Sequence, residues 1–227
     1  IAISGETLGQ SIAFDKNNFK KRGKELKEAI LQIEQGDIDF TNLKFATALK
    51  HFLIANEFNP ENAGLNYKIG KCYINSSEKR KSLGYFQKAY SLDAEVDKEI
   101  QYYLAYAYHL NNQFDDRTLQ LYQNFSKKML KIPALERTTT KKEVSRKIEE
   151  YKNGMELFRH PVDIEIENIA EINSAFPDYS PVITADESVM FLTSRRPGST
   201  GGQLDDDPKF DDAMYREDIY SSSYRKG

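Results

Sequence analysis

Residues 63–96 carry the pattern that most constrains what this chain can fold into. An apolar, a small and an aromatic residue lie at helical spacing at Ile69, Gly70 and Tyr73, and after a turn Phe86 and Ala89 follow. Glycine costs a helix about 1 kcal/mol relative to alanine, so Gly70 indicates a close approach by a second helix. The segment is therefore predicted to be two packed helices joined by a turn, with Asp93 near the end of the second.

The preceding segment repeats the signature of the second helix. Ala48, Phe52 and Ala55 have the matching spacing, and Pro60 follows where it can stop the helix. The first helix of this pair is expected over about 18–35, with Gly36 as its stop and a long turn to about residue 43. Its apolar residues at helical spacing are Leu26, Ala29, Ile30 and Ile33.

A third pair is predicted from Asp97, a good N-cap residue. Leu104, Ala105 and Tyr108 take the first-helix positions. The second helix departs from the pattern, because Arg117 stands where alanine is usual and Leu121 replaces the aromatic residue.

A further helix is expected after the linker-like run 138–140. Thr140 and Glu143 form a capping-box pair before it. Its apolar residues at helical spacing are Val144, Ile148, Tyr151 and Met155. This helix is expected to cover the exposed end of the stack.

Paired helices with these residues at these spacings resemble the tetratricopeptide repeat. The resemblance implies a helical solenoid over residues 18–160, after an N-terminal extension over 1–17. The fold class is therefore expected to be mainly α.

After Pro161 the period changes from helical to alternating. Residues 162–167 alternate apolar with acidic, which predicts a half-buried strand. A hairpin is predicted from 181–184, a turn at 185–188 and a strand at 189–194. Another strand opens at 217–220, after a long loop rich in Gly, Ser and Asp.

This second part resembles a blade of the PD40 (WD40-like) β-propeller. The resemblance rests on Asp178-Tyr179-Ser180-Pro181 with the residues that follow, on 191–196, and on Asp218-Ile219-Tyr220. Residues 161–227 suffice for roughly one blade of the four or more that a propeller needs. An incomplete propeller is therefore expected here.

Tetratricopeptide repeats leading into a PD40 propeller resemble a family of Bacteroidota cell-envelope proteins that ends in an OmpA-like peptidoglycan-binding domain. The resemblance implies a non-enzymatic scaffold in the periplasm, associated with the outer membrane, with a lipoprotein anchor as one form of that association. Its partners would be subunits of a type IX secretion or gliding complex, with peptidoglycan bound through a C-terminal domain outside this sequence. The alternative is an accessory propeller protein that binds or processes peptide or carbohydrate elsewhere in a longer chain. A cytoplasmic co-chaperone-like repeat protein ranks last, because it would need a clamp rich in lysine and arginine, whereas the predicted inner face of the helix stack offers Lys71 but mostly tyrosines.

The candidate binding site is the inner face of the stack, formed by the first helix of each pair. Tyrosine buries area at modest entropic cost and keeps a polar group, which suits a peptide-binding surface. The competing interpretation is that these tyrosines belong to the core. The predicted residues are Tyr67, Lys71, Ile74, Asn75, Glu99, Tyr102, Tyr106 and His109.

Charge and chemistry exclude several classes of function. The formal net charge is −3, so nucleic acid is not expected as a partner. The basic clusters 20–22, 79–81 and 141–142 are interpreted as solvated helix faces or ends. No metal, cofactor or catalytic residue is predicted, and no apolar run is long enough to span a membrane.

Weaker motifs receive structural interpretations. The three histidines, His51, His109 and His160, lack the spacing of a helical metal pair. Cys72 is expected to be a buried thiol. The acidic run 205–212 is interpreted as a solvated loop rather than a calcium site, and the glycine-rich run 198–202 as a weak phosphate-loop match. Arg195 and Arg196 are expected to pair with acidic loop residues, with an anion site as the alternative.

Overall fold

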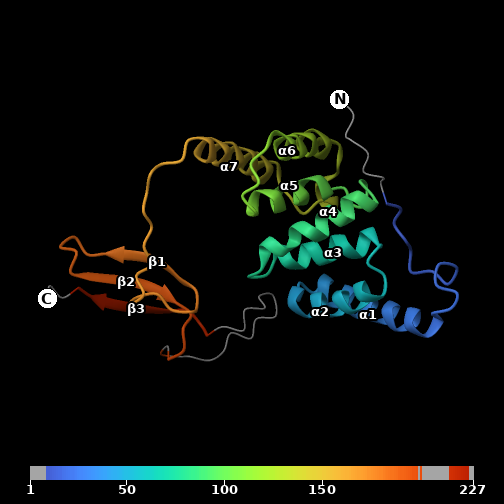
Figure 1. Ribbon diagram of the computed structural model, residues 1–227, viewed down its shortest axis with the longest axis horizontal. Helices are drawn as coiled ribbons and strands as arrows, with labels where there is room; N and C mark the ends of the chain where they lie inside the picture. The colour runs from blue at the N-terminus through green and yellow to red at the C-terminus, as the bar shows by residue number, and fades with distance from the viewer. Residues whose placement is uncertain (1–8, 199, 201–214, 225–227) are drawn as a thin grey trace. The chain divides into compact units, whose positions relative to one another are not determined.

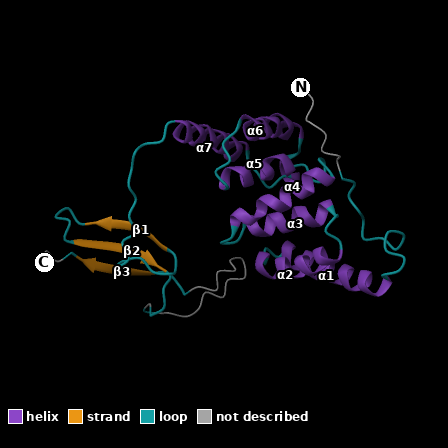
Figure 2. Cartoon of the chain, in the orientation of Figure 1, coloured by secondary structure: helices purple, strands orange, loops and turns teal. Residues whose placement is uncertain are grey.

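The computed structural model describes residues 9–198, 200 and 215–224 (Figure 1). Within these residues the chain is mainly helical, with seven α-helices and one three-stranded antiparallel sheet. Contacts divide it into two compact units that meet in sequence between Val162 and Asp163. The first unit holds the helices and the second holds the sheet (Figure 2).

Each helix of the first unit packs mainly on its neighbours in the sequence. The α-helices are α1 (Gly23–Thr41), α2 (Phe45–Phe58), α3 (Ala63–Ile74), α4 (Ser82–Leu92), α5 (Ile100–Leu110), α6 (Asp116–Lys128) and α7 (Lys141–Arg159). Short 3-10 turns lie at η1 (Lys79–Lys81), η2 (Met129–Lys131) and η3 (Ala134–Glu136). The predicted helix–turn–helix over 63–96 is confirmed as α3 and α4, and Asp93 caps the end of α4.

The first two helix pairs share one close contact between a glycine and an aromatic ring. A Cβ added to Gly36 would lie 2.5 Å from Cε1 of Phe52, and a Cβ added to Gly70 would lie 2.7 Å from Cε1 of Phe86. The prediction that Gly36 ends its helix is wrong, because this packing keeps it inside α1, which continues to Thr41. The turn to α2 is therefore short rather than long.

The start of the first helix also differs from expectation. Helix α1 begins at Gly23 rather than near residue 18. The residues before it pack against the helices: Ile12 donates its backbone N–H to the Glu61 carbonyl at 2.7 Å. The Phe19 ring lies 4.7 Å from that of Phe58 between centroids. These contacts hold the segment in an irregular conformation, so helix formation starts later.

The third pair shows two corrections. Helix α5 starts at Ile100, and the Asp97 carboxylate accepts the backbone N–H of Glu99 at 2.8 Å before the helix begins. In α6 the buried aromatic residue is Tyr122, with Phe125 three residues later, whereas Leu121 is half-buried. The register of α6 is thus one residue later than the sequence pattern indicates.

Helix α7 packs on α6 and α5. The predicted N-cap is confirmed, because the Thr140 hydroxyl accepts the Glu143 backbone N–H at 3.1 Å. The Glu143 carboxylate does not complete the capping box, since it accepts a hydrogen bond from Tyr102 instead. Val144, Tyr151 and Met155 are buried.

The second unit is a meander of β1 (Asp178–Ile183), β2 (Val189–Ser194) and β3 (Asp218–Ser223), in the order β1-β2-β3. The predicted hairpin and third strand are confirmed. The register shifts between Tyr179 and Val182, where Ser180 has a φ of 53°. Val182 pairs with Phe191, and Thr193 pairs with Ile219, so these four side chains share one face.

The strand predicted at 162–167 does not form. Val162, Ile164 and Ile166 are 67%, 66% and 90% exposed. Alternation favours a strand only where a neighbouring strand supplies hydrogen bonds, and the described residues place none beside this segment.

Candidate functional site

The eight residues of the predicted binding site lie on two helices of the first unit, and we call them the inner face. Four come from α3 and its C-cap, and four come from α5 and its N-cap. They differ widely in burial. Glu99, Tyr102 and Lys71 are buried, whereas the other five are half-buried. The chain itself covers part of this face through the segment 137–140 and through α7.

Glu99 anchors the covering segment. One carboxylate oxygen accepts the backbone N–H of Thr138 at 2.8 Å and its hydroxyl at 2.7 Å. The other accepts the backbone N–H of Thr139 at 2.9 Å and its hydroxyl at 2.6 Å. Burial raises the pKa of Glu99, but the hydrogen bonds from Thr139 and Thr138 outweigh it and hold the pKa below the usual value. Glu99 is only 4% exposed, so it supports the fold rather than meeting a partner.

Lys71 places a cation in the same cluster. Its Nζ lies 3.7 Å from the ring centroid of Tyr103 and 3.3 Å from the Thr138 hydroxyl. The Tyr103 hydroxyl in turn lies 2.6 Å from that of Thr138. Burial lowers the pKa of Lys71 to about 8, although Glu99 and other carboxylates oppose the shift. The ring face and the hydroxyl partly replace the water that this cation loses.

Two of the predicted tyrosines use their hydroxyls inside the protein. Tyr67 donates to Asp97 at 2.8 Å, and Tyr102 donates to Glu143 at 2.9 Å. Burial and these carboxylates raise the pKa of both phenols, which keeps them neutral hydrogen-bond donors. Tyr102 is 1% exposed, so in this conformation it belongs to the core.

The half-buried end of the inner face is formed by Tyr106 and His109. The Lys147 ammonium of α7 lies 4.8 Å from the Tyr106 ring centroid. The His109 ring packs edge-on against Tyr151, with centroids 5.3 Å apart. Burial lowers the pKa of His109, and the charge of Lys147 adds to the shift. Ile74 and Asn75 lie half-buried at the end of α3.

Sequence reasoning missed the residues that cover the inner face. The run Thr138-Thr139-Thr140 has the composition of a linker, yet two of its hydroxyls and two of its amides bind Glu99. The one available signal was Glu99 itself, since a buried carboxylate needs several donors. Thr138 and Thr139 lie about 40 residues after Glu99, so the sequence did not identify them as its partners.

The other motifs fall outside this face. Cys72 is 1% exposed, and burial raises the pKa of its thiol to about 12, so the expected buried thiol is confirmed. His51 lies 2.7 Å from the Gln32 side chain. No cluster of three His, Cys, Asp or Glu suited to a metal ion occurs among the residues that the structure describes. The acidic run 205–212 and most of the glycine-rich run 198–202 lie outside them.

In the second unit Arg196 organises one end of the sheet. It donates to the Asp178 carboxylate at 2.7 Å and to the Ile172 carbonyl at 2.8 Å, and its guanidinium lies over the Tyr220 ring. The predicted pairing with an acidic residue is thus confirmed for Arg196, but the partner lies in β1 rather than in a loop. Arg195 donates to the Tyr215 carbonyl at 3.1 Å.

Comparison with family models gives no match, and no curated protein matches the sequence significantly. Among the described residues, no helix combines the length and the apolar character that crossing a membrane requires.

Proposed function

We propose that this chain is a non-enzymatic scaffold whose helical unit is a tetratricopeptide-type repeat module that binds a protein partner. The observation that carries the proposal is the contact of Gly36 with Phe52 and of Gly70 with Phe86. The same pair recurs 34 residues later, which is the period of this repeat. Stacked repeats of this kind present extended surfaces that bind other proteins.

The sheet unit is proposed to be one blade of a PD40-like propeller. Val182, Phe191 and Ile219 share one face and are 63%, 44% and 74% exposed. Apolar side chains gathered on one face of a sheet favour a covering partner. In a propeller the neighbouring blades provide that cover.

The cellular setting proposed is the bacterial envelope. The order of a repeat module followed by a propeller blade supports a periplasmic protein at the outer membrane, in a type IX secretion or gliding complex. An OmpA-like domain outside these residues would tether the complex to peptidoglycan. Fractionation of the native cells tests this: recovery in the outer-membrane fraction supports the location, and recovery in the cytosol contradicts it.

Partner binding is proposed at the half-buried end of the inner face, around Tyr106 and His109. Glu99, Tyr102 and Lys71 form its support, because their polar groups are bound by the chain itself. Tyr106 presents part of an aromatic ring between α5 and Lys147 of α7. Such a ring beside a cation suits an anchor contact in an interface.

The experiment is capture of partners by the tagged full-length protein from its native cells under gentle extraction. Tyr106→Ala with His109→Ala should remove the captured subunit and lower the melting temperature only slightly. Tyr108→Ala is the matched control, because the Tyr108 hydroxyl accepts from Gln87 on α4, away from this end. A clean monomer in every preparation would count against the scaffold.

A further inference from the structure

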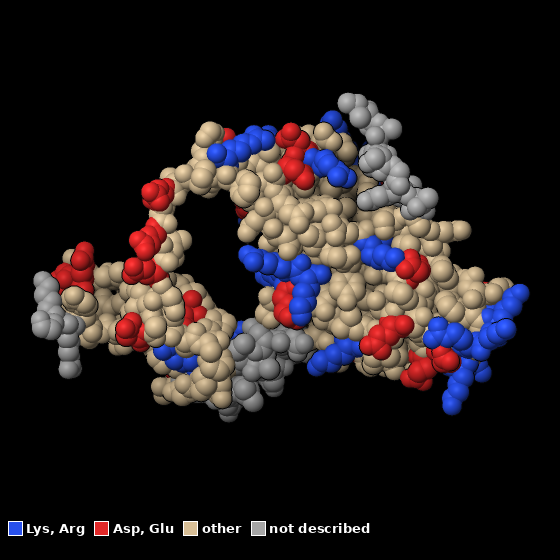
Figure 3. Space-filling model, viewed as in Figure 1, with Lys and Arg blue, Asp and Glu red and all other residues tan. Residues whose placement is uncertain are grey.

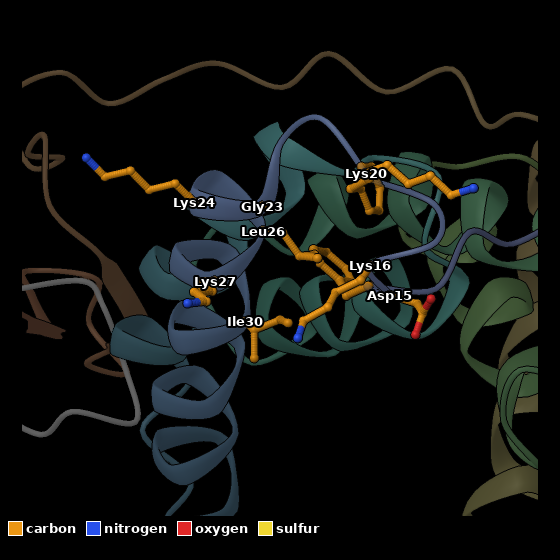
Figure 4. Close-up of a pocket in the computed structure, with 10 residues that line it drawn as sticks. Asp15, Lys16, Lys20, Gly23, Lys24, Leu26, Lys27 and Ile30 are labelled. Atoms are coloured by element: carbon orange, nitrogen blue, oxygen red, sulfur yellow. The ribbon is translucent and has the colours of Figure 1, made fainter.

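A cleft opens where the N-terminal segment turns into α1 (Figure 4). Its volume is about 610 Å³, enough for one or two large side chains of a ligand. It is lined by Phe14, Asp15, Lys16, Phe19, Lys20, Gly23, Lys24, Leu26, Lys27 and Ile30.

The floor of the cleft is apolar and anchored. The Phe14 ring stacks on Phe58 of α2 and the Phe19 ring packs against it at a tilt, with centroids 6.1 and 4.7 Å away. Leu26 is 2% exposed, and Ile30 is half-buried one turn further along α1. Because these rings already pack on one another, the floor is preformed rather than assembled by a ligand.

The rim of the cleft is basic. Lys16, Lys20, Lys24 and Lys27 line it, and none of the four forms an ion pair with a described residue. Figure 4 shows Lys20 and Lys24 extending outward to opposite sides, with Lys16 lying near Leu26.

This local charge opposes that of the whole chain. Residues 15–28 hold six basic and three acidic side chains, although the formal net charge of the protein is −3. Figure 3 shows the basic side chains gathered over the start of α1. Lys20, from the cluster 20–22 that the sequence indicated as a solvated face, therefore lines the rim of a cleft.

We propose that this cleft binds an acidic peptide segment of a protein partner. One or two large apolar side chains of the peptide would fill the cleft, and its carboxylates would meet the lysines. The positive end of the α1 dipole lies at Gly23, and it also favours a negatively charged ligand. The inference rests on the proposed function and adds a second contact surface with a defined chemistry.

The shape favours a peptide over other anionic partners. Insertion into a bilayer needs an apolar surface that protrudes, whereas this one is concave with charges around it. Binding single-stranded nucleic acid needs free aromatic faces for stacking, and Phe14 and Phe19 use theirs on Phe58. A concave apolar floor with a charged rim matches an acidic peptide with apolar anchors.

The test uses the whole chain and a fluorescein-labelled peptide in which glutamates alternate with leucine and phenylalanine. One control peptide has lysine in place of glutamate, and a second has serine in place of the apolar residues. Phosphatidylglycerol vesicles are the membrane probe. Binding of the first peptide alone, weakened by salt, is the expected result.

Variants locate the site. Lys20→Glu with Lys24→Glu should weaken peptide binding by about tenfold or more. Lys79→Glu with Arg80→Glu reverses two charges in another exposed basic cluster and should leave binding unchanged. Ile30→Gln, which removes an apolar part of the floor without changing charge, should also weaken binding. Circular dichroism confirms that each variant is folded.

Several outcomes overturn the inference: equal binding of the serine peptide, binding of vesicles but not of the peptide, or no effect of the Lys20 and Lys24 reversals. Capture of the native partner separates this inference from the proposed function. If the native partner still binds the variant with Lys20 and Lys24 reversed, but no longer binds the variant with Tyr106→Ala and His109→Ala, the proposal for the cleft is refuted and the scaffold proposal stands. Absence of any native partner refutes the scaffold, whatever the peptide does.

Discussion

Gly70 lies so close to Phe86 that a methyl group at position 70 would overlap the ring. The first pair of helices repeats this relationship at Gly36 and Phe52. In each case the glycine lowers helix propensity and the close packing against the ring offsets that loss. The repeat is therefore defined by a contact between helices rather than by the propensity of either one.

Gly70→Ala should destabilise the protein by about 1–3 kcal/mol, because the Phe86 ring must move to admit the methyl group. Gly84→Ala in α4 is the control, since nothing lies within 4 Å of a Cβ at that position. That change should stabilise the protein by about 0.5–1 kcal/mol. Urea unfolding measures both, and destabilisation by Gly84→Ala as large as that by Gly70→Ala would contradict the account.

Glu99→Gln should release the segment that covers the inner face. In the wild type the backbone N–H groups and hydroxyls of Thr138 and Thr139 all donate to the Glu99 carboxylate. The side-chain amide in Glu99→Gln would replace one accepting oxygen with a donor and so lose part of these hydrogen bonds. The expected loss is about 2–3 kcal/mol. Hydrogen exchange of the Thr138 and Thr139 amides should accelerate well beyond that of the α3 amides; unchanged protection would show that Glu99 does not hold the segment.

Glu99 also predicts a pH dependence. Its pKa in the folded protein lies below the unfolded value of about 4.3, so its stabilisation is complete above that pH. The stabilisation is lost as the pH falls through the folded pKa. Unfolding of the wild type should therefore become easier in this acidic window, and Glu99→Gln should flatten the dependence. Glu149→Gln, at an exposed position in α7, should keep it.

Lys71 predicts a pH dependence of the same sign in the alkaline range. Its folded pKa is about 8, below the usual 10.5, so the unfolded chain binds more protons between these values. Stability from this group therefore rises with pH through that window, and its cost is fully present below pH 8. Lys71→Met should be as stable as the wild type, or more so, at neutral pH. The difference in free energy of unfolding between Lys71→Met and the wild type should shrink by on the order of 2 kcal/mol by about pH 9.5. Lys152→Met, at an exposed site, should show no such change.

The exposed face of the sheet gives a test of the proposed propeller. Phe191→Cys should react readily with a maleimide in this chain, because position 191 is 44% exposed. Cys72 should stay unreactive, since it is buried and its thiol pKa is raised to about 12. In a longer native protein with neighbouring blades the new thiol should be protected. Equal labelling in both would contradict a propeller.

The sequence predicted elements best where the evidence was local. Short-range spacing and turn residues predicted helices α3 and α4, the N-cap of α7 and the hairpin β1–β2. The end of α1 was missed, because glycine commonly ends a helix. Only the contact of Gly36 with Phe52 keeps it inside the helix. The register of α6 was missed because Tyr122 lies 36 residues after Phe86, two more than the 34-residue frame.

The candidate site was less predictable than the helices. The spacing of Tyr67, Lys71 and Tyr102 placed them correctly on α3 and α5 but could not tell which hydroxyls the chain itself would bind. The partners of Glu99 lie about 40 residues away in a threonine run that carries no periodic signal. The alternation at 162–167 indicated a strand, but no described neighbour provides its hydrogen bonds.

The central claim is that this chain is a protein-binding scaffold. The most direct measurement is the mass of the full-length protein after gentle extraction from its native cells, by size-exclusion chromatography with light scattering and mass spectrometry. We predict a stoichiometric complex with an envelope subunit, which Tyr106→Ala with His109→Ala should abolish. A monodisperse monomer with no bound partner would contradict it.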